Sequence, residues 1–169
     1  MRLLLIGLAA AGASARAAEA QQPPQGPGWI EKVDVCADRR KPQAERIDAC
    51  TEVYQNAIDK GIKAYALWYR SDAKLETGDF EGAIADSDEA DRILPDDAAI
   101  LNARCWTRAA ANREHDVARG ACDLSISRLA SAGTLDSRGL VSLREGRWQE
   151  AWDDYNEAFA MDSSIRSAL

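Results

Sequence analysis

Small and apolar residues recur at a fixed spacing along the second half of the chain. Five matching pairs share one offset in numbering, 68: Leu75/Leu143, Gly78/Gly146, Phe80/Trp148, Ala83/Ala151 and Ala90/Ala158. This offset is twice 34, so one more unit of the same length fits between the two copies. We call this interval of 34 the repeat period. A period of this length is typical of a repeat protein, in which each unit is one supersecondary motif.

Each unit is predicted to be a helical hairpin. An amphipathic stretch ends at a glycine, Gly78 or Gly146, which can take the left-handed conformation that ends a helix. A short polar link follows, and an aromatic residue with an alanine three positions later begins a second amphipathic stretch. One hairpin cannot bury its apolar face alone, but stacked hairpins can. We expect no strands and eight helices, at about 29–40, 44–60, 62–77, 79–93, 97–111, 114–129, 132–145 and 147–161.

This pattern resembles the tetratricopeptide repeat (TPR) family, whose unit has about 34 residues with small or apolar residues at set positions. The matching residues are Leu67, Ser71, Gly78, Ala83, Ala90 and Pro95 in a unit starting at Ala64, and Leu135, Gly139, Ala151, Tyr155 and Ala158 in a unit starting at Ala132. Both units depart from the family at position 7, where Arg70 and Arg138 replace an apolar residue. The resemblance implies an all-α, TPR-like α-solenoid of about four helix-turn-helix units, 29–61, 64–97, 98–131 and 132–163.

The first and third units match this pattern less well. In the third unit Asn112 stands where the glycine should be, and asparagine also suits a left-handed cap. Ala118 fills its expected position only if the link between the two helices is one residue longer. In the first unit "RKPQAE" is expected to be the link, shorter by two residues, before a second helix containing "RIDACTEVYQNAI".

Residues 1–20 have the pattern of a Sec-type signal peptide: Arg2, an apolar run from Leu3 to about Ala13, and small residues in an A-x-A arrangement. We expect cleavage after Ala20, with cuts after Ala15 or Ala17 as alternatives. The apolar run is too short to span a bilayer, which takes roughly 20 residues, so no stable membrane insertion is expected. A buried N-terminal helix is the alternative interpretation. Residues 21–28, "QQPPQGPG", are expected to be a spacer, and residues 164–169 a C-terminal tail.

Export implies an oxidising periplasm or extracellular space, where four cysteines allow three disulfide pairings. The TPR register places Cys36 and Cys105 at unit position 8, and Cys50 and Cys122 at position 24, on facing sides of one hairpin. The resemblance therefore implies the disulfides Cys36–Cys50 and Cys105–Cys122. Helices packed about 8–10 Å apart bring facing Cα atoms within the range that a disulfide needs.

Metal, redox and nucleophile chemistry are the competing interpretations of these cysteines. The only histidine, His115, has no second histidine at a zinc-ligand spacing, and no C-x-x-C occurs. A Cys–His nucleophile pair fails if Cys105 is oxidised. We expect no metal site and no cofactor, and we expect His115 to be an exposed residue of the link.

The charge pattern narrows the class of partner. The net charge of −7 argues against nucleic acid as the main partner, because nucleic acid needs a basic surface. The acidic stretch "ADSDEADRILPDD" (Asp86, Asp88, Glu89, Asp91, Asp96, Asp97) is expected to form a solvated helix face and helix caps. A basic partner docking on this stretch is the alternative. No catalytic or phosphate-binding motif appears, so we expect a protein that is not an enzyme.

In the resembling family the first helices of the units line a concave groove. Carried over by position, the groove residues are Tyr65, Trp68, Tyr69, Asp72, Asn102, Trp106, Asp136 and Arg144, with Glu76, Ser137, Leu140, Ala99, Ala103 and Ala110 beside them. Aromatic residues next to polar ones suit a protein or peptide partner. The alternative for Trp68 and Trp106 is packing between units. Asn102 alone matches the Lys/Asn clamp with which some members bind a C-terminal carboxylate, so that ligand is not expected.

Two classes of function follow from the sequence. The first is a periplasmic or secreted adaptor, or scaffold, that binds a partner segment in the groove. The second is a self-associating structural subunit, a homodimer for example, because the sequence ends shortly after the fourth unit and an uncapped apolar end invites association.

Overall fold

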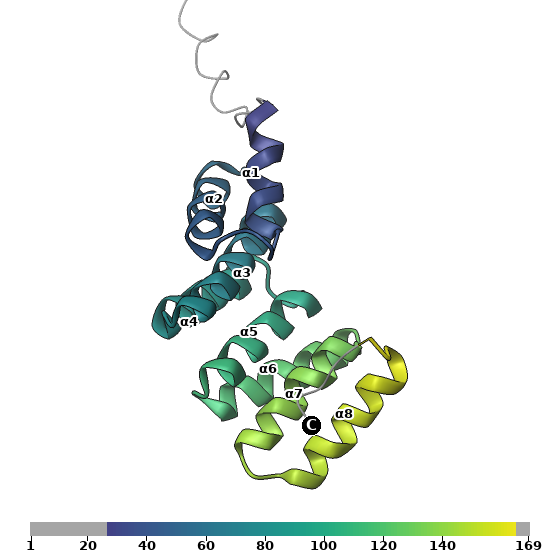
Figure 1. Ribbon diagram of the computed structural model, residues 1–169. Helices are drawn as coiled ribbons and strands as arrows, with labels where there is room; N and C mark the ends of the chain where they lie inside the picture. Colours follow the sequence, from purple (N-terminus) through teal and green to yellow (C-terminus); the bar gives the residue numbers. More distant parts are fainter. Residues whose placement is uncertain (1–26, 165–169) are drawn as a thin grey trace, which may run out of the picture.

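The computed structural model describes residues 27–164. The expected signal peptide (1–20), most of the expected spacer (21–26) and residues 165–169 of the expected tail lie outside these described residues. Residues 27–164 form eight α-helices and no strand (Figure 1). The helices are α1 (Pro27–Ala37), α2 (Gln43–Asn56), α3 (Lys60–Thr77), α4 (Phe80–Ile93), α5 (Ala98–Ala111), α6 (His115–Arg128), α7 (Ala132–Arg144) and α8 (Trp148–Met161).

Successive helices pair into four hairpins that stack in chain order. The first helix of each hairpin contacts the first helix of the next, so that α1, α3, α5 and α7 form one continuous layer. The second helices α2, α4 and α6 each contact the first helix of the following hairpin as well as their own partner. Figure 1 shows this succession from α1 at one end to α8 at the other. The predicted all-α solenoid is confirmed.

Left-handed residues end three of the helices, as the sequence predicted for the glycine positions. Gly78 has φ 82° and Gly146 has φ 74°. Asn112 takes the equivalent place after α5 with φ 56°, and its backbone N–H is bonded to the carbonyl oxygens of Arg108 and Ala109. Asparagine tolerates this conformation better than most residues with a Cβ, which explains why it can replace glycine here.

The link after α5 corrects one expectation. Glu114 adopts a second left-handed conformation, with φ 48°, and α6 begins at His115. His115 is therefore the first residue of a helix and is partly buried, instead of lying exposed in the link. Its Nε2 atom is 3.1 Å from Oδ1 of Asn112. α4 begins at Phe80, and α6 begins one position later than one repeat period after Phe80. The link between α5 and α6 is therefore one residue longer, as predicted.

The acidic stretch at the end of α4 is not the solvated helix face that we expected. Asp97 does cap α5, accepting hydrogen bonds from the backbone N–H groups of Ala99 and Ile100 at 3.0 Å. Asp86, however, is buried and is bound by Arg70 and Lys74. The carboxylates on this face neutralise cations from neighbouring helices, which a pattern of acidic residues alone does not reveal.

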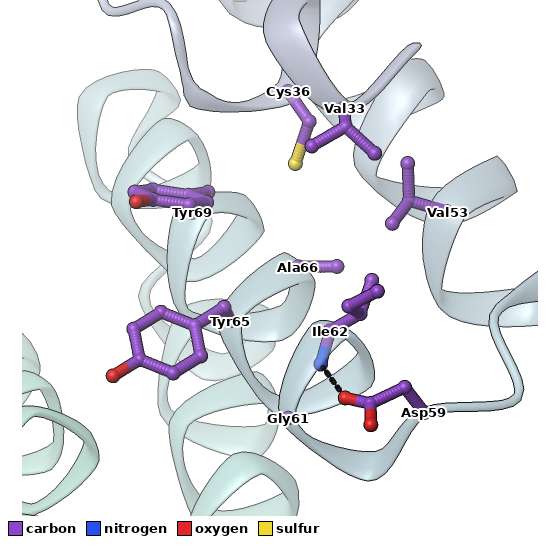
Figure 2. Close-up of a pocket in the computed structure, with 9 residues that line it drawn as sticks. All are labelled: Val33, Cys36, Val53, Asp59, Gly61, Ile62, Tyr65, Ala66 and Tyr69. Atoms are coloured by element: carbon purple, nitrogen blue, oxygen red, sulfur yellow. Dashed lines mark hydrogen bonds between the residues drawn. The ribbon is translucent and has the colours of Figure 1, made fainter. Parts of the chain in front are cut away.

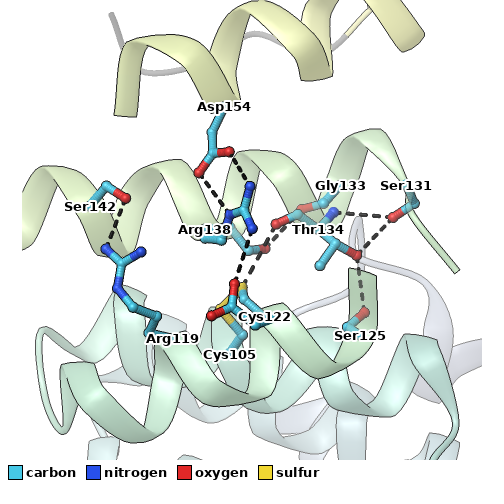
Figure 3. Close-up of a disulfide and its surroundings, with 12 residues drawn as sticks. Cys105, Arg119, Cys122, Ser125, Ser131, Gly133, Thr134, Arg138, Ser142 and Asp154 are labelled. Carbon is cyan, nitrogen blue, oxygen red and sulfur yellow. Dashed lines mark hydrogen bonds and ion pairs between the residues drawn. A yellow bond between two sulfur atoms is a disulfide. The ribbon is translucent and has the colours of Figure 1, made fainter. Parts of the chain in front are cut away.

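The two disulfides join the cysteine pairs that the repeat register implied. Cys36 and Cys50 have Cα atoms 4.7 Å apart, and Cys105 and Cys122 have Cα atoms 5.3 Å apart. Figure 3 shows the second bridge beneath α7. The pairs are 14 and 17 residues apart, which reflects the shorter link in the first unit and the longer one in the third. Each disulfide ties the two helices of one hairpin together.

In the fourth unit a glycine and an aromatic ring, Gly139 and Tyr155, hold the two unit positions that the bridged cysteines hold in the first and third units. A Cβ atom built on Gly139 in α7 would lie 2.7 Å from the ring of Tyr155 in α8. Tyr155 is buried, so its ring cannot move out of the way without exposing apolar surface. Unit position 8 is therefore a point of close approach between helices, which is why only small residues or a bridged cysteine occupy it.

We expect Gly139→Ala to lower the free energy of unfolding by about 1–3 kcal/mol, because the added methyl group overpacks this contact. Gly120→Ala is the matched control, since Gly120 is also a helical glycine and its Cβ would meet nothing within 4 Å. Alanine favours helix over glycine by about 1 kcal/mol, so the control is expected to be stabilised. Urea unfolding followed by circular dichroism measures both. Equal effects of the two substitutions would contradict the close approach.

An arginine ladder accounts for the departure from the family at position 7. Arg70, Arg104 and Arg138 are one repeat period apart, on α3, α5 and α7. Within a unit, Arg70 binds Asp86 at 2.7 and 2.8 Å, and Arg138 binds Asp154 at 2.6 and 3.0 Å. The side chains also reach back to the preceding unit, to the acceptors Thr51, Asp88 and Asp123. The arginines thus connect neighbouring units where the family places an apolar residue.

Candidate binding groove

The layer of first helices carries a pocket near the middle of the array, which we call the central pocket. It has a volume of about 220 Å³. Three first helices, α3, α5 and α7, and the link between α1 and α2 supply its walls. The lining residues are Arg39, Trp68, Asn102, Ala103, Trp106, Gly133, Asp136 and Ser137.

The repeat explains why these residues meet. Trp68, Asn102 and Asp136 are one repeat period apart and occupy the same position on three adjacent first helices. Stacking of identical hairpins places equivalent positions side by side, so residues far apart in the sequence line one surface. Trp106 lies one helical turn beyond Asn102 on α5 and extends the same wall.

Trp68 belongs to an aromatic cluster on α3. Its ring stacks on Tyr69, with centroids 5.2 Å apart and planes at 14°, and contacts Tyr65 at 5.5 Å. Trp68 also packs against the buried cluster that contains Leu67 and Ile100. The tryptophan therefore packs between units on one side and lines the central pocket on the other, so the two interpretations of Trp68 from the sequence both apply.

A second pocket, which we call the apolar pocket, lies where α1, α2 and α3 meet (Figure 2). It has a volume of about 310 Å³ and is lined by Val33, Cys36, Val53, Asp59, Gly61, Ile62, Tyr65, Ala66 and Tyr69. Asp59 is engaged at the rim, where its carboxylate caps the backbone N–H of Ile62 at 2.9 Å. Burial raises the pKa of the Tyr65 hydroxyl above its ordinary value.

Tyr65 and Tyr69 connect the two pockets. Both line the apolar pocket, and both contact Trp68, which lines the central pocket. An apolar pocket and a polar pocket thus lie on either side of one aromatic cluster. This combination suits a ligand with an apolar anchor and polar groups next to it.

Six of the eight residues that the sequence assigned to the groove line one of these pockets. Trp68, Asn102, Trp106 and Asp136 line the central pocket, and Tyr65 and Tyr69 the apolar pocket. Arg144 lines neither and is exposed in the last turn of α7.

Asp72 corrects the groove assignment. It is only 5% exposed, because Arg39 binds its carboxylate and Nη2 of Arg46 lies 3.8 Å away. Asp72 therefore acts beneath the groove, where it positions Arg39 in the wall of the central pocket. Sequence analysis missed Arg39 because the residue lies in the irregular link of the weakest unit, where a repeat position cannot be assigned.

Asn102 is one of the polar residues that line the central pocket, on the middle one of its three helices, α5. Its Oδ1 atom is buried and has no hydrogen-bond partner among the described residues. Unsatisfied buried acceptors are rare and cost about 1–3 kcal/mol. A donor brought by a ligand, with a small rotation of the amide, would satisfy this atom.

Three further observations bear on the chemistry of the chain. In residues 27–164, no group of three or more His, Cys, Asp or Glu side chains is placed to hold a metal ion. All four cysteines are in disulfides, so the chain has no free thiol. No helix in the described part of the chain is both long and apolar enough to cross a membrane.

Comparison with known proteins leaves the family open. No protein-family model matches the chain. No curated protein matches it significantly either. A function for this protein must therefore be inferred from its own surface.

Proposed function

We propose that this protein is a non-catalytic adaptor of the periplasm or the extracellular space. It binds an extended segment of a partner protein along the layer formed by α1, α3, α5 and α7. The observation that carries the proposal is the pair of pockets joined by the aromatic cluster Tyr65, Trp68 and Tyr69. The units are assigned to the TPR type, which the regular spacing of structurally equivalent residues, one repeat period apart, supports.

The location rests on the cysteines and on the N-terminal sequence. Disulfides persist in oxidising compartments, and this chain has two of them, both buried. Residues 1–20 are proposed to direct export as a Sec signal peptide and to be removed after Ala20.

The two pockets suggest how the partner segment is held. A bulky aliphatic or aromatic side chain fills the apolar pocket against Val33, Val53 and Ile62. The segment then crosses the faces of the aromatic cluster. A polar residue beyond it enters the central pocket, where Arg39 and Asn102 offer hydrogen bonds.

Peptide selection tests this proposal. The mature chain is used to select from a phage library of random linear peptides, and the enriched peptides are measured by calorimetry. Trp106→Ala and Tyr65→Ala are each expected to weaken binding by about 10-fold to 30-fold, as is usual for aromatic anchors. Leu129→Ala is the control, because Leu129 is 67% exposed and lines neither pocket. Selection without enrichment, or equal binding by all three variants, would contradict a peptide groove.

A further inference from the structure

One wall of the central pocket offers hydrogen-bond acceptors. Oδ1 of Asn102 is buried and accepts no hydrogen bond from any residue in 27–164. The hydroxyl of Ser137 donates to the carbonyl oxygen of Gly133 at 2.9 Å, so its oxygen is left to accept from a ligand. Gly133 lies next to both, because a Cβ atom built on it would be 3.8 Å from Nδ2 of Asn102. This wall therefore suits a group that donates hydrogen bonds.

Arg39 brings hydrogen-bond donors to the same pocket. Its Nη2 atom binds the carboxylate of Asp72, and its side chain is still 64% exposed. A guanidinium carries more N–H groups than this carboxylate takes, so Arg39 can donate to a ligand as well. Asp72 is buried, which fixes the arginine in the pocket wall. The entering group therefore also needs an acceptor, for Arg39.

The lining of the central pocket carries one charge of each sign, on Arg39 and on Asp136. An acidic side chain would be attracted by Arg39 and repelled by Asp136, and a basic side chain would experience the reverse. A charged group also loses hydration when it enters a pocket, and this cost is recovered only where the group is well paired. The two wall charges thus favour a neutral group over a charged group of either sign.

We propose that the side chain bound in the central pocket is a primary amide, from a glutamine or an asparagine of the partner segment. Its carbonyl oxygen accepts from Arg39, and its NH2 group donates to Oδ1 of Asn102 and to Oγ of Ser137. Among uncharged side chains, only these two combine an acceptor oxygen with an NH2 group. This inference rests on the proposed function, because it names the side chain with which the partner segment enters the pocket.

The size of the pocket and its two tryptophans fit this side chain. A volume of about 220 Å³ corresponds to roughly seven water molecules, which is room for an amide and its methylene groups. The methylene groups can pack on Trp68 and Trp106, which line the pocket too. A large apolar residue would bring no donor to Oδ1 of Asn102 and would leave that acceptor buried and unsatisfied, which lowers affinity.

Nuclear magnetic resonance of the isotope-labelled mature chain tests the amide directly. The chain is titrated with N-acetyl-glutamine N-methylamide and with the glutamate, lysine and leucine compounds that carry the same caps. The glutamine compound is expected to shift the indole N–H signals of Trp68 and Trp106 at millimolar concentration. The glutamate compound has nearly the same shape. We expect it and the other two to bind at least about 10-fold more weakly, because none of them pairs with both Arg39 and Asn102.

Asn102→Leu removes the buried acceptor with little change in size. This variant is expected to bind the glutamine compound at least about 10-fold more weakly, while its thermal midpoint does not fall, because an unsatisfied buried acceptor has been removed. A merely structural role of Asn102 would lower the midpoint. Asn156→Leu is the matched control, because Asn156 is exposed on α8 and lines neither pocket, and it should bind as the wild type does.

The outcomes separate this inference from the peptide groove itself. The amide is overturned, and the groove retained, by selected peptides that bind without a glutamine or asparagine. Glutamate or lysine compounds that bind as well as the glutamine compound, tryptophan signals that do not shift, or unchanged binding by Asn102→Leu would also overturn the amide. Peptide selection without enrichment, together with binding of the glutamine compound, would overturn the groove and retain the amide site.

Discussion

Replacing Cys105 and Cys122 together by alanine is expected to lower the free energy of unfolding by about 3–4 kcal/mol. The bridge spans 17 residues, and closing a loop of that length in the unfolded chain accounts for about 3 kcal/mol. The rest comes from packing. Both cysteines are fully buried, in a cluster that also contains Ala109, Ala118 and Val141. Loss of the two sulfur atoms therefore leaves unfilled space in a buried core.

This bridge is expected to matter more than the other one. The cluster around it joins the third unit to α7 of the fourth, and the Cys122 sulfur lies 3.7 Å from the carbonyl oxygen of Thr134 in α7 (Figure 3). Replacing Cys36 and Cys50 by alanine is the comparison, since its 14-residue loop has nearly the same entropy. That variant is expected to lose about 3 kcal/mol, at the first unit and its contact with Ala66 of α3. The third unit contacts a unit on each side, whereas the first contacts only the second among the described helices, so the Cys105–Cys122 bridge affects more of the array.

Urea unfolding, followed both by circular dichroism and by tryptophan fluorescence, measures the two effects. Repeat arrays can unfold in parts, so disagreement between the two probes would show that units unfold separately. A loss below about 1 kcal/mol for the Cys105/Cys122 variant would mean that helix packing alone holds the third hairpin closed.

Arg138→Met is expected to destabilise the protein by about 2–3 kcal/mol. Arg138 is the ladder arginine that connects three helices, because it binds Asp154 of α8 and Asp123 of α6. The side chain of Asp154 is only 8% exposed, and Arg138 is its only cation among the described residues. Removing the arginine leaves a buried carboxylate without a partner, which costs about 3–5 kcal/mol when both groups of the pair are fully buried. The expected loss is smaller because Arg138 itself remains 27% exposed.

Two companion variants separate this effect from a general loss of charge. Arg138→Met combined with Asp154→Leu removes both charges, and the pair of apolar side chains is expected to recover most of the stability. Arg92→Met breaks the exposed pair with Glu89, where the arginine side chain is 72% exposed, and should cost less than about 0.5 kcal/mol. An equal loss in Arg92→Met and Arg138→Met would show that the ladder does not stabilise the array.

The sequence reveals the positions of the ladder arginines but not the groups that they bind. Arg70 and Arg138 stand out as departures from the TPR pattern, yet a one-dimensional pattern does not say what they bind. The acceptors of Arg70, Arg104 and Arg138 in the preceding units are Thr51, Asp88 and Asp123, at separations that the variable links change from one unit to the next. Only the stacked hairpins bring these groups within hydrogen-bond distance.

The groove residues also divide into those that the sequence identified and those that only the structure placed. The resemblance to TPR units implied Trp68, Asn102 and Asp136, which hold one equivalent position in three units and line the central pocket together. Arg39 and Asp72 could not be placed in this way. Arg39 lies in an irregular link. Asp72 is buried because its carboxylate binds Arg39 of that link and lies near Arg46 of α2, both in the neighbouring unit.

The sequence by itself determined the elements, their order and the cysteine pairs. Helix periodicity, left-handed caps and a constant repeat period are local or repeated properties, and each copy of the pattern supports the others. The tertiary structure alone decided which charges are buried, where the pockets lie and that Trp148, Trp152 and Phe159 remain exposed. Burial depends on which surfaces other helices cover, and in a solenoid the covering helix comes from the next unit. A residue's own unit therefore does not reveal whether its side chain is covered.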